Sequence, residues 1–560
     1  SMPTFAQNIT RGPYFQMTSS SSTRIRFRTD VESKPSILVG KSPNSLTRSI
    51  KQTNFTKEHE LTIDSLSSNT RYYYKVVTPT QTIGDSTFYF QTAPNKGSKN
   101  KFSFWSTGDM YPGQPQLDVL SGFQKFIGNK YTNLYLTLGD NVYSGANDAD
   151  FQTNFFQVYQ SLLKQSTAFP AVGNHDYDYT SQKQDDPSIA YYQNFSLPQK
   201  AELGGISSNK EAYYSFDYGN VHFICLDPHA YGEDNVRLWE NNTSAQLAWL
   251  EQDLKNNTQD WTIVYFHYPI YTKGSYDSDS NTGFNLPIYN LRNLLVPIFD
   301  KYQVDMVLTA HSHVYERSKP LKGHTGTSDT FDPNKHNPQI STGKYDGSDN
   351  SCPYLFESSK PSQNGTLYIV NGVGGGTKPA RPDSPHKAMY YTNASVNGSF
   401  YVEIENNRLD AKFLDTNGDI LDKFTVFKNL NLKPTTNLTI DYGKSTDLVA
   451  SWIGQYNWST NQTSSKITVN PSSTTSFQVN DPQKCFTEKF NVTVNAPLGT
   501  LESRQIPFDE LKVYNLQGQL IKQYDQKGNL TDEIIHELPQ GSYILRVLWN
   551  GQEKSMKIIR

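Results

Sequence analysis

The chain has 560 residues, a formal net charge of −3, 19% charged residues and 13% aromatic residues. This length fits three or four domains of ordinary size, with enough aromatic side chains for several hydrophobic cores. The near-neutral charge gives no sign of a nucleic-acid groove or of a surface for anionic membranes, so we expect no nucleic-acid partner. No run of about 18 apolar residues occurs, and no transmembrane segment is predicted.

The first part of the chain has the pattern of a β module. Apolar and charged residues alternate in Thr23–Arg28, and Tyr72–Val77 is rich in aromatic and β-branched residues. The turn cluster Ser67–Thr70 lies between such strands, and the hydrophilic run Asn95–Asn100 follows them. We therefore predict a small β-sandwich over residues 1–99.

From Lys101 onward, apolar strands alternate with helical stretches, which is typical of an α/β layered domain. We predict that this domain covers residues 100–430. Lys322–Gln363 is poor in apolar residues and is predicted to be a long surface insertion. The predicted strands are Phe102–Ser106, Leu134–Leu138, Ala168–Val172, Tyr213–Phe216, Val221–Leu226, Thr262–Phe266 and Val304–Thr309, and the predicted helices are Leu117–Ile127, Phe151–Lys164, Ser244–Lys255 and Leu291–Tyr302.

Two further β modules are predicted after the α/β domain. Asp447–Trp452, Ser465–Val469 and Phe490–Val494 have the composition of strands, which favours an immunoglobulin-like domain over residues 431–497. Residues 498–560 again have the pattern of a β domain, in which Asn550-Gly551 is typical of a tight hairpin turn.

The clearest chemical pattern lies in Leu136–Tyr143, where an apolar strand ends at Gly139 and Asp140 follows at once. Glycine lets the backbone turn there without a side chain in the way. A carboxylate has two oxygens and can bridge two cations, and the phenolate of Tyr143 is a hard anionic ligand suited to a trivalent metal. A single Gly-Asp pair is more often only a turn, so further motifs are needed to distinguish a metal site from a turn.

Four more motifs follow predicted strands of the same domain. They are Gly108-Asp109, Gly173-Asn-His-Asp176, His267 and His311-Ser-His313. Each alone has an ordinary structural explanation, since a lone histidine is usually structural. In open α/β sheets, however, ligands bind at the carboxyl ends of strands. Five such strand ends at one edge of a sheet could surround two metal ions.

The order of these motifs resembles that of the purple acid phosphatases, a family of the calcineurin-like metallophosphoesterase superfamily. The resemblance covers about residues 100–428 and implies an αββα sandwich, and Tyr143 separates this family from most of the superfamily. Arg11–Gln16 resembles the usual opening of the fibronectin type III-like domain that precedes many of these catalytic domains. Ala310 stands where the family has glycine, and we expect little effect from its small methyl group.

The resemblance implies a set of metal ligands and catalytic residues. Implied ligands are Asp109, Tyr143 and His313 for Fe(III), Asn174, His267 and His311 for a divalent Zn, Fe or Mn ion, and Asp140 as the bridge between the ions. His175 is implied to be the catalytic general acid, oriented by Asp176. The plant enzymes have two histidines where this chain has Tyr271–Asp277, and we predict His229 and Tyr276 as substrate-binding residues instead.

The function that the resemblance implies is that of an acid phosphatase. Such an enzyme cleaves monoesters of phosphorylated small molecules by attack of a metal-bound hydroxide. Two alternatives remain: a phosphodiesterase or phytase on the same scaffold, and a surface adhesin built on an inactive phosphatase fold. The complete ligand set, including Tyr143, argues against the adhesin.

The end of the chain resembles a second family. Leu511–Ile521, Leu538–Val547 and Lys557–Arg560 are similar to the C-terminal sorting domain of the type IX secretion system of Bacteroidetes. This resemblance implies a secreted or cell-surface protein, with the export machinery as a partner.

Overall fold

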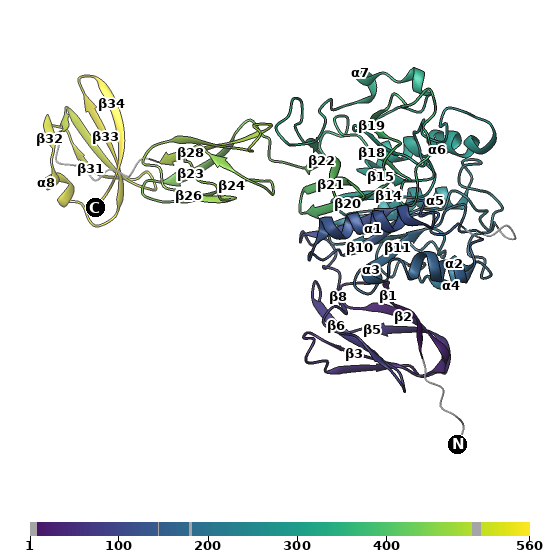
Figure 1. Ribbon diagram of the computed structural model, residues 1–560. Coiled ribbons are helices and arrows are strands. Elements are labelled where there is room, and N and C mark those ends of the chain that lie inside the picture. The colour runs from purple at the N-terminus through teal and green to yellow at the C-terminus, as the bar shows by residue number, and fades with distance from the viewer. Residues whose placement is uncertain (1–7, 144, 178–181, 496–505) are drawn as a thin grey trace. The chain divides into compact units, whose positions relative to one another are not determined.

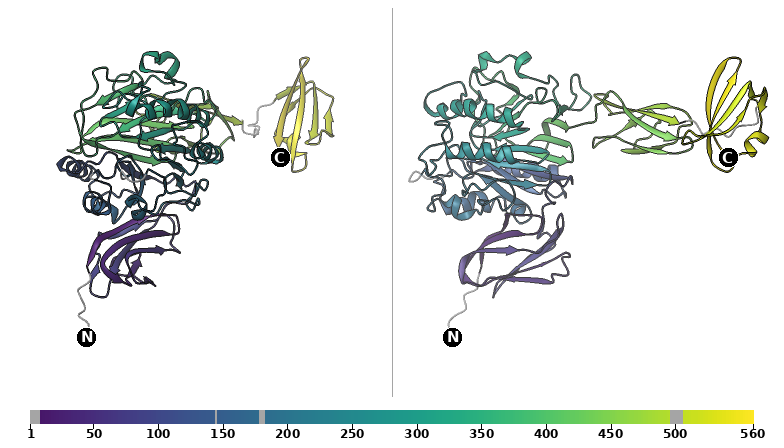
Figure 2. Two further views of the ribbon diagram at one scale, coloured as in Figure 1. Left: turned by 90° about the vertical axis from the view of Figure 1, so that its right-hand side faces the viewer. Right: turned by 180° about the vertical axis from the view of Figure 1, so that it is seen from behind.

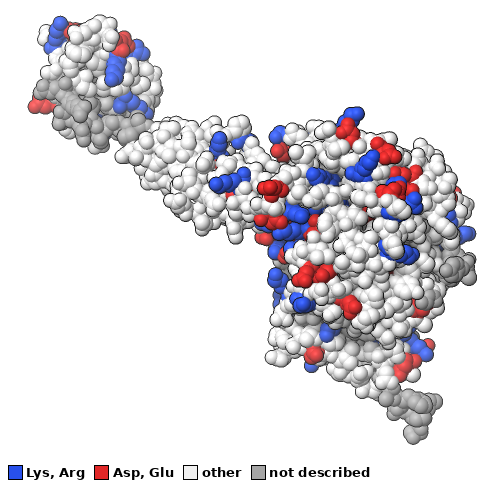
Figure 3. Space-filling view, turned by 45° about the horizontal axis from the view of Figure 1, so that its top comes forward, with Lys and Arg blue, Asp and Glu red and all other residues white. Residues whose placement is uncertain are grey.

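The structure is a computed structural model that describes residues 8–143, 145–177, 182–495 and 506–560 (Figure 1). The chain divides into two compact units, Ser1–Leu430 and Asn431–Arg560. Within the described residues, no helix is both long and apolar enough to cross a membrane. On the face in Figure 3, basic and acidic side chains of the first unit lie among one another.

Two sheets form the centre of the first unit. The larger sheet has the order β17 (Tyr354–Phe356), β22 (Ile420–Lys428), β21 (Arg408–Asp415), β20 (Gly398–Glu405), β9 (Phe102–Thr107), β10 (Leu134–Leu138), β11 (Thr167–Ala171), β1 (Ile9–Gln16), β2 (Thr23–Ser33) and β5 (Thr56–Ile63). The smaller sheet has the order β12 (Tyr214–Tyr218), β13 (Val221–Cys225), β14 (Trp261–Tyr265), β15 (Met306–Thr309), β18 (Leu367–Asn371), β16 (Tyr315–Ser318) and β19 (Met389–Asn393).

The two sheets pack face to face, and helices cover their outer faces. Phe169 of β11 stacks on Phe216 of β12 with ring centroids 3.9 Å apart. On the outer face of the larger sheet, Trp105 stacks on Phe123 of α1 (Gln114–Ile127) at 4.4 Å. Ile224 of β13 shares a core with α5 (Ala245–Asn256) and α6 (Leu286–Tyr302). Strands β9, β11 and β13 are buried at every position, because both of their faces are covered. The helix–sheet–sheet–helix layering matches the predicted central architecture.

The helices differ from their predicted bounds where local chemistry sets the ends. The helix predicted over Phe151–Lys164 is broken into α2 (Asp148–Phe151), a π-helical turn (Gln152–Phe156) and α3 (Gln160–Leu163). Asn147 starts α2 by a capping box with Asp150. The remaining helical segments of the described unit are α4 (Ala190–Asn194), η2 (Gly283–Asn285), η3 (Ser328–Thr330) and α7 (Pro333–His336).

The predicted surface insertion Lys322–Gln363 needs a correction. Tyr354–Phe356 forms strand β17, which pairs in parallel with β22 at the edge of the larger sheet. Tyr354 and Phe356 are both buried. A strand of three residues is too short to give a periodic pattern, so a polar average over the insertion conceals it.

The N-terminal strands form a sandwich that is continuous with the larger sheet (Figure 2, purple). Strand β1 pairs in parallel with β11 through Phe15 and Thr167. Facing β1, β2 and β5 is a second sheet made of β4 (Arg48–Lys51), β3 (Ser36–Gly40), β6 (Arg71–Val77), β7 (Thr82–Ile83) and β8 (Tyr89–Gln91). Phe15, Phe27 and Tyr74 belong to the core between these sheets. A domain boundary at residues 99 and 100 stays a prediction.

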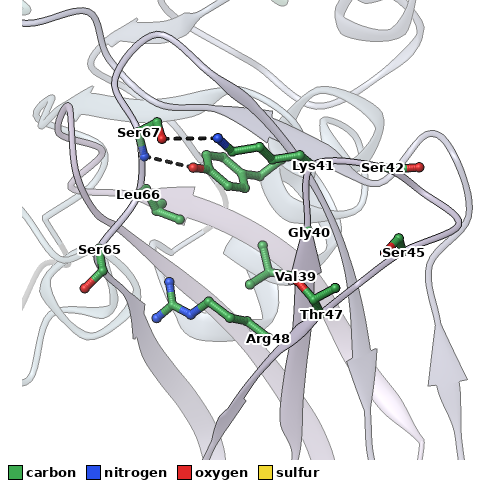
Figure 4. Close-up of a pocket in the computed structure, with 11 residues that line it drawn as sticks. Val39, Gly40, Lys41, Ser42, Ser45, Thr47, Arg48, Ser65, Leu66 and Ser67 are labelled. Carbon is green, nitrogen blue, oxygen red and sulfur yellow. Dashed lines mark hydrogen bonds between the residues drawn. The ribbon is translucent and has the colours of Figure 1, made fainter.

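A pocket of about 460 Å³ opens in this N-terminal sandwich beside β3 (Figure 4). The side chains of Lys41 and Arg48 reach it from two sides. Lys41 Nζ donates a 3.2 Å hydrogen bond to Ser67 Oγ, and the Ser67 amide donates to the Tyr72 hydroxyl at 2.8 Å. The lining contains none of the residues predicted to bind metal or substrate.

The second unit consists of small β-sheets. Its described sheets are β23 (Thr436–Asp441), β28 (Thr487–Asn495), β27 (Thr475–Asn480) and β25 (Asn457–Trp458); β24 (Thr446–Val449) and β26 (Lys466–Val469); β29 (Ile506–Phe508) and β32 (Gly528–Leu530); and β31 (Leu520–Tyr524), β30 (Glu510–Asn515), β33 (Ser542–Trp549) and β34 (Gln552–Ile559), with the short helix α8 (Asp532–His536). Asn550 and Gly551 have φ values of 49° and 73° and join β33 to β34, which confirms the predicted hairpin turn.

Candidate metal centre

The predicted site residues lie after the carboxyl ends of strands from both sheets. Asp109, Asp140 and Asn174 follow β9, β10 and β11, which are parallel neighbours in the larger sheet. His267 and His311 follow β14 and β15, which are parallel neighbours in the smaller sheet. The two sets meet directly, because a Cβ atom on Gly139 would lie 2.7 Å from Nδ1 of His267. The face-to-face packing of the sheets therefore assembles the site.

One group of donors gathers around His267. Asp140, His267 and His311 are buried, and their potential ligand atoms lie within 4.8 Å of one another. Nε2 of His267 is 3.1 Å from Nδ1 of His311 and 3.3 Å from Oδ2 of Asp140. Oδ1 of Asn174 lies 3.1 Å from the same nitrogen. The structure thus brings together all the residues predicted for the divalent ion and for the bridge.

A second group of donors adjoins the first. The Tyr143 hydroxyl donates a 2.8 Å hydrogen bond to Oδ1 of Asp109, and Nε2 of His313 lies 3.2 Å from that oxygen. The backbone N–H of His311 donates to Oδ2 of Asp109 at 2.6 Å. Asp109 therefore links Tyr143 and His313, the other two residues predicted for Fe(III), to the group around His267.

The backbone of the site adopts conformations that L-residues rarely take. Asp109, Asp140 and His311 have φ values of 55°, 51° and 63°. A left-handed residue other than glycine costs of order 1–3 kcal/mol, and such residues cluster at functional sites. Close packing adds a further constraint, because a Cβ atom on Gly173 would lie 2.2 Å from the amide nitrogen of Asp140. The fold therefore maintains a strained arrangement that places these side chains at one edge.

The donor set fits a cation. Nδ1 of His267 donates to the carbonyl oxygen of Leu138 at 2.8 Å, so its Nε2 is the atom turned toward the oxygens of Asp140 and Asn174. Burial alone would lower the pKa of His267, but the Asp140 carboxylate raises it to about 9. The adjoining His311 differs, because burial and the nearby His267 lower its pKa well below its usual value. Carboxylate, imidazole, phenol and amide groups together suit hard and borderline metal ions.

His175 lies at the edge of this cluster. Its backbone N–H donates to Oδ1 of Asp140 at 2.8 Å, and its partly exposed ring packs 4.5 Å from the ring of Tyr143. The prediction that Asp176 orients His175 is wrong. The Asp176 carboxylate instead accepts hydrogen bonds from the Gly173 amide and from the amide and side chain of Asn141, at 2.7–2.9 Å. Asp176 therefore joins the turn after β11 to the turn after β10. The polar residue Asn141, directly after Asp140, is the sequence feature that could have indicated this contact.

Both predicted substrate-binding residues lie near the cluster. The Tyr276 ring stacks on His311 with centroids 3.9 Å apart. His229 reaches the site through Tyr268: its Nδ1 is 2.7 Å from the Tyr268 hydroxyl, and the Tyr268 ring is 4.5 Å from that of His311. Burial, assisted by Arg237, lowers the pKa of His229 to about 4. Tyr268 was not predicted as a residue of the site, although its position directly after His267 indicates that it lies close to the site.

Sequence comparisons relate two parts of the chain to known families. Residues 102–315 match the Calcineurin-like phosphoesterase family, and residues 486–560 match the Secretion system C-terminal sorting domain. A phosphoenolpyruvate phosphatase of Allium cepa is 26% identical over 304 residues, which are 51% of this chain and 57% of that protein. The Fe(3+)-Zn(2+) purple acid phosphatase 12 of Arabidopsis thaliana is 25% identical over 328 residues, 57% of this chain and 60% of that protein. The chain thus spans less than two thirds of the length of these relatives.

Solved structures share the fold. The purple acid phosphatase PPD1 of yellow lupin (Lupinus luteus) superposes with a TM-score of 0.53 and 16% identity, covering 75% of each chain. A structure of PhoD superposes with a TM-score of 0.54 and 14% identity, covering 76% of this chain and 92% of that one. The chain therefore contains a calcineurin-like phosphoesterase domain with purple acid phosphatases among its homologues, and it ends in a sorting domain that points to secretion or to the cell surface.

Proposed function

We propose that this protein is a dinuclear-metal acid phosphatase that cleaves phosphate monoesters. The observation that carries the proposal is the position of Asp140 between the two donor groups. Its Oδ2 lies 3.3 Å from Nε2 of His267 in one group. Its backbone is joined to the other group, because the amides of Asp109 and Met110 donate hydrogen bonds to the carbonyl oxygens of Gly139 and Asp140 at 3.2 and 3.1 Å. A carboxylate in this position is suited to bridge two cations.

The proposed ligands follow from these groups. Asp109, Tyr143 and His313 would hold Fe(III), Asn174, His267 and His311 would hold a divalent Zn, Fe or Mn ion, and Asp140 would contact both. The Arabidopsis relative named as an Fe(3+)-Zn(2+) enzyme supports this pair of metals. When bound, the two cations supply charge for the phosphate oxygens and activate a water molecule.

The chain itself supplies the proton for the leaving group. We assign this role to His175, because its ring is partly exposed at the edge of the cluster while its backbone is held by Asp140. A general acid must reach the leaving oxygen without being a metal ligand. Tyr276, which stacks on His311, and His229, which bonds to the Tyr268 hydroxyl, would contact the substrate.

The accessory modules have supporting roles in this proposal. The two-sheet sandwich formed by the described residues 8–99 supports a fibronectin type III-like domain over residues 1–99, and the described sheets after residue 431 support an immunoglobulin-like domain over residues 431–497. The C-terminal sorting domain, which we predict over residues 498–560 and whose family match begins at residue 486, would bring the enzyme to the export machinery and so to phosphorylated substrates outside the cell.

The substitution Asp140→Asn tests the proposal. It should lower the content of both metals, measured by elemental analysis, and abolish hydrolysis of p-nitrophenyl phosphate. Asp329→Asn is the control, since the Asp329 side chain is 92% exposed and pairs only with Lys387 in the described ion pairs. Full retention of one metal would show that Asp140 does not bridge. Faster cleavage of bis(p-nitrophenyl) phosphate than of the monoester would show that the protein is a phosphodiesterase and not a phosphomonoesterase.

A further inference from the structure

The rim of the metal centre carries an exposed aromatic ring that the proposed mechanism does not use. Tyr111 follows Asp109 by two positions and is 54% exposed. Most tyrosines of the catalytic domain are buried in its cores, so this ring stands out by its exposure beside a polar site. An open aromatic face near a catalytic centre is a place where a planar group can stack.

The backbone of Tyr111 is held firmly although its ring is open. Its amide donates a 2.9 Å hydrogen bond to the carbonyl oxygen of Asp109. The glycine-rich loop after β18 packs against it, because a Cβ atom on Gly375 would lie 2.2 Å from the Tyr111 nitrogen and 2.3 Å from its oxygen. The position of the ring is therefore set by the same turn that presents Asp109 to the site.

Tyr111 packs against a ring of the donor set. Its centroid is 5.0 Å from that of Tyr143, in an edge-on arrangement, and Tyr143 packs in turn 4.5 Å from His175. The hydroxyl of Tyr143 contacts Asp109. Tyr143 is itself one of the proposed donors, so the exposed ring of Tyr111 lies directly beside the site where the phosphate would bind.

We propose that Tyr111 forms a binding subsite for the base of a nucleoside monophosphate, and that this subsite makes nucleoside 5′-monophosphates preferred substrates. The inference rests on the proposed phosphatase activity and specifies its substrate class. With the phosphate at the donor cluster, the ribose would pass Tyr143 and the base would stack on Tyr111. Water then attacks phosphorus, the bond from phosphorus to the 5′ oxygen breaks, and the nucleoside leaves with a proton while inorganic phosphate remains.

The test compares AMP with ribose 5-phosphate, using the metal-loaded full chain. Both substrates release a primary 5′ hydroxyl, so their chemistry is matched and only the base differs. Stacking of one base on an aromatic side chain contributes about 1–3 kcal/mol, so kcat/KM for AMP should exceed that for ribose 5-phosphate by about fivefold or more. The difference should lie mainly in KM. Tyr111→Leu should bring the ratio close to one, whereas Tyr111→Phe should preserve it.

Tyr442→Leu is the matched control, because Tyr442 is 52% exposed and belongs to the second unit. It should leave the ratio unchanged. A ratio near one in the unsubstituted protein, or the same ratio in Tyr111→Leu, would overturn the subsite while leaving the phosphatase activity established. If neither compound nor p-nitrophenyl phosphate is hydrolysed, the proposed function fails and this inference fails with it.

Discussion

The backbone N–H of His311 donates a 2.6 Å hydrogen bond to Oδ2 of Asp109. These residues follow strands of different sheets, β15 and β9, and both have left-handed backbones. The bond therefore joins the two sheets at the point where their donors meet. It also leaves Oδ1 of Asp109 directed toward Tyr143 and His313. The Asp109 carboxylate thus contacts the side chains of Tyr143 and His313 with one oxygen and the backbone of His311 with the other.

The first prediction concerns colour. Burial, Asp109 and Asp140 raise the pKa of Tyr143, so the phenol keeps its proton until a strongly charged cation displaces it. We expect the iron-loaded protein to be violet or pink through a phenolate-to-Fe(III) charge-transfer band. Tyr143→Phe should remove this band in the visible spectrum, and Tyr111→Phe should retain it. A colourless sample with full iron occupancy and activity would contradict the assignment of Tyr143.

The second prediction concerns the packing beneath Asp140. A Cβ atom on Gly173 would lie 2.2 Å from the Asp140 nitrogen and 2.3 Å from its Oδ1, so Gly173→Ala must displace this carboxylate. Overpacking of this kind typically costs about 1–3 kcal/mol. We expect at least about tenfold lower activity and faster loss of metal to a chelator, with unchanged circular dichroism. Gly376→Ala is the control, since a Cβ atom there would meet no atom within 4 Å beyond its chain neighbours. Equal metal retention in both variants would contradict the prediction.

The third prediction concerns stability against pH, away from the metal centre. The buried ring of His222 lies between Asp217 and Asp253, with 2.7 Å from Nδ1 and from Nε2 to the respective carboxylates, and Lys96 pairs with Asp217. Burial lowers the pKa of His222, but the two carboxylates raise it from 6.5 to about 9. A raised pKa stabilises the folded state fully below pH 6.5, and this stabilisation is lost as pH rises through about 9.

His222→Gln should therefore lower the urea midpoint most at pH 6 and least above pH 9. The shift corresponds to at most about 3 kcal/mol, since one pKa unit is worth about 1.4 kcal/mol. Unfolding is followed by tryptophan fluorescence in buffers matched for ionic strength. The same loss of stability at both pH values would show that the charge of His222 contributes nothing and that only its packing matters.

The sequence predicts those site residues that directly follow a recognisable strand. Asp140 and Tyr143 follow the run Leu134–Leu138, whose predicted bounds are those of β10. Strands of this kind are buried on both faces and give continuous apolar runs, so their ends are easily located. Because parallel strands present their carboxyl ends at the same edge, the meeting of His267 with His311 could also be predicted.

Other contacts depend on three-dimensional packing that no local pattern encodes. Asp176 follows His175 directly, yet its carboxylate binds Asn141, which comes from the loop after another strand. The pairing of β1 with β11 joins segments that are far apart in the sequence. In the same way, Gly375 must be a glycine because it packs against the backbone of Tyr111, which is distant in the sequence. Such relations appear only when the sheets are assembled.

The fourth prediction concerns His175. Its backbone N–H binds Asp140, but its ring is not part of the cluster formed by Asp140, His267 and His311. His175→Ala should therefore keep both metals, measured by elemental analysis, while turnover falls. A general acid typically contributes 10²–10⁴-fold, so we expect a loss of about 100-fold or more.

The size of that loss should depend on the leaving group, and this dependence identifies the role of His175. An alkyl phosphate such as glycerol phosphate releases a poor leaving group that needs a proton, so its hydrolysis should lose most. p-Nitrophenyl phosphate releases a stable anion and should lose least. An equal loss for both substrates would show that His175 binds the phosphate instead of donating a proton. The hydrogen bond to Asp140 comes from the backbone N–H of His175 and survives the substitution. Loss of metal from His175→Ala would therefore be due to loss of the ring, and would show that the ring holds the site together.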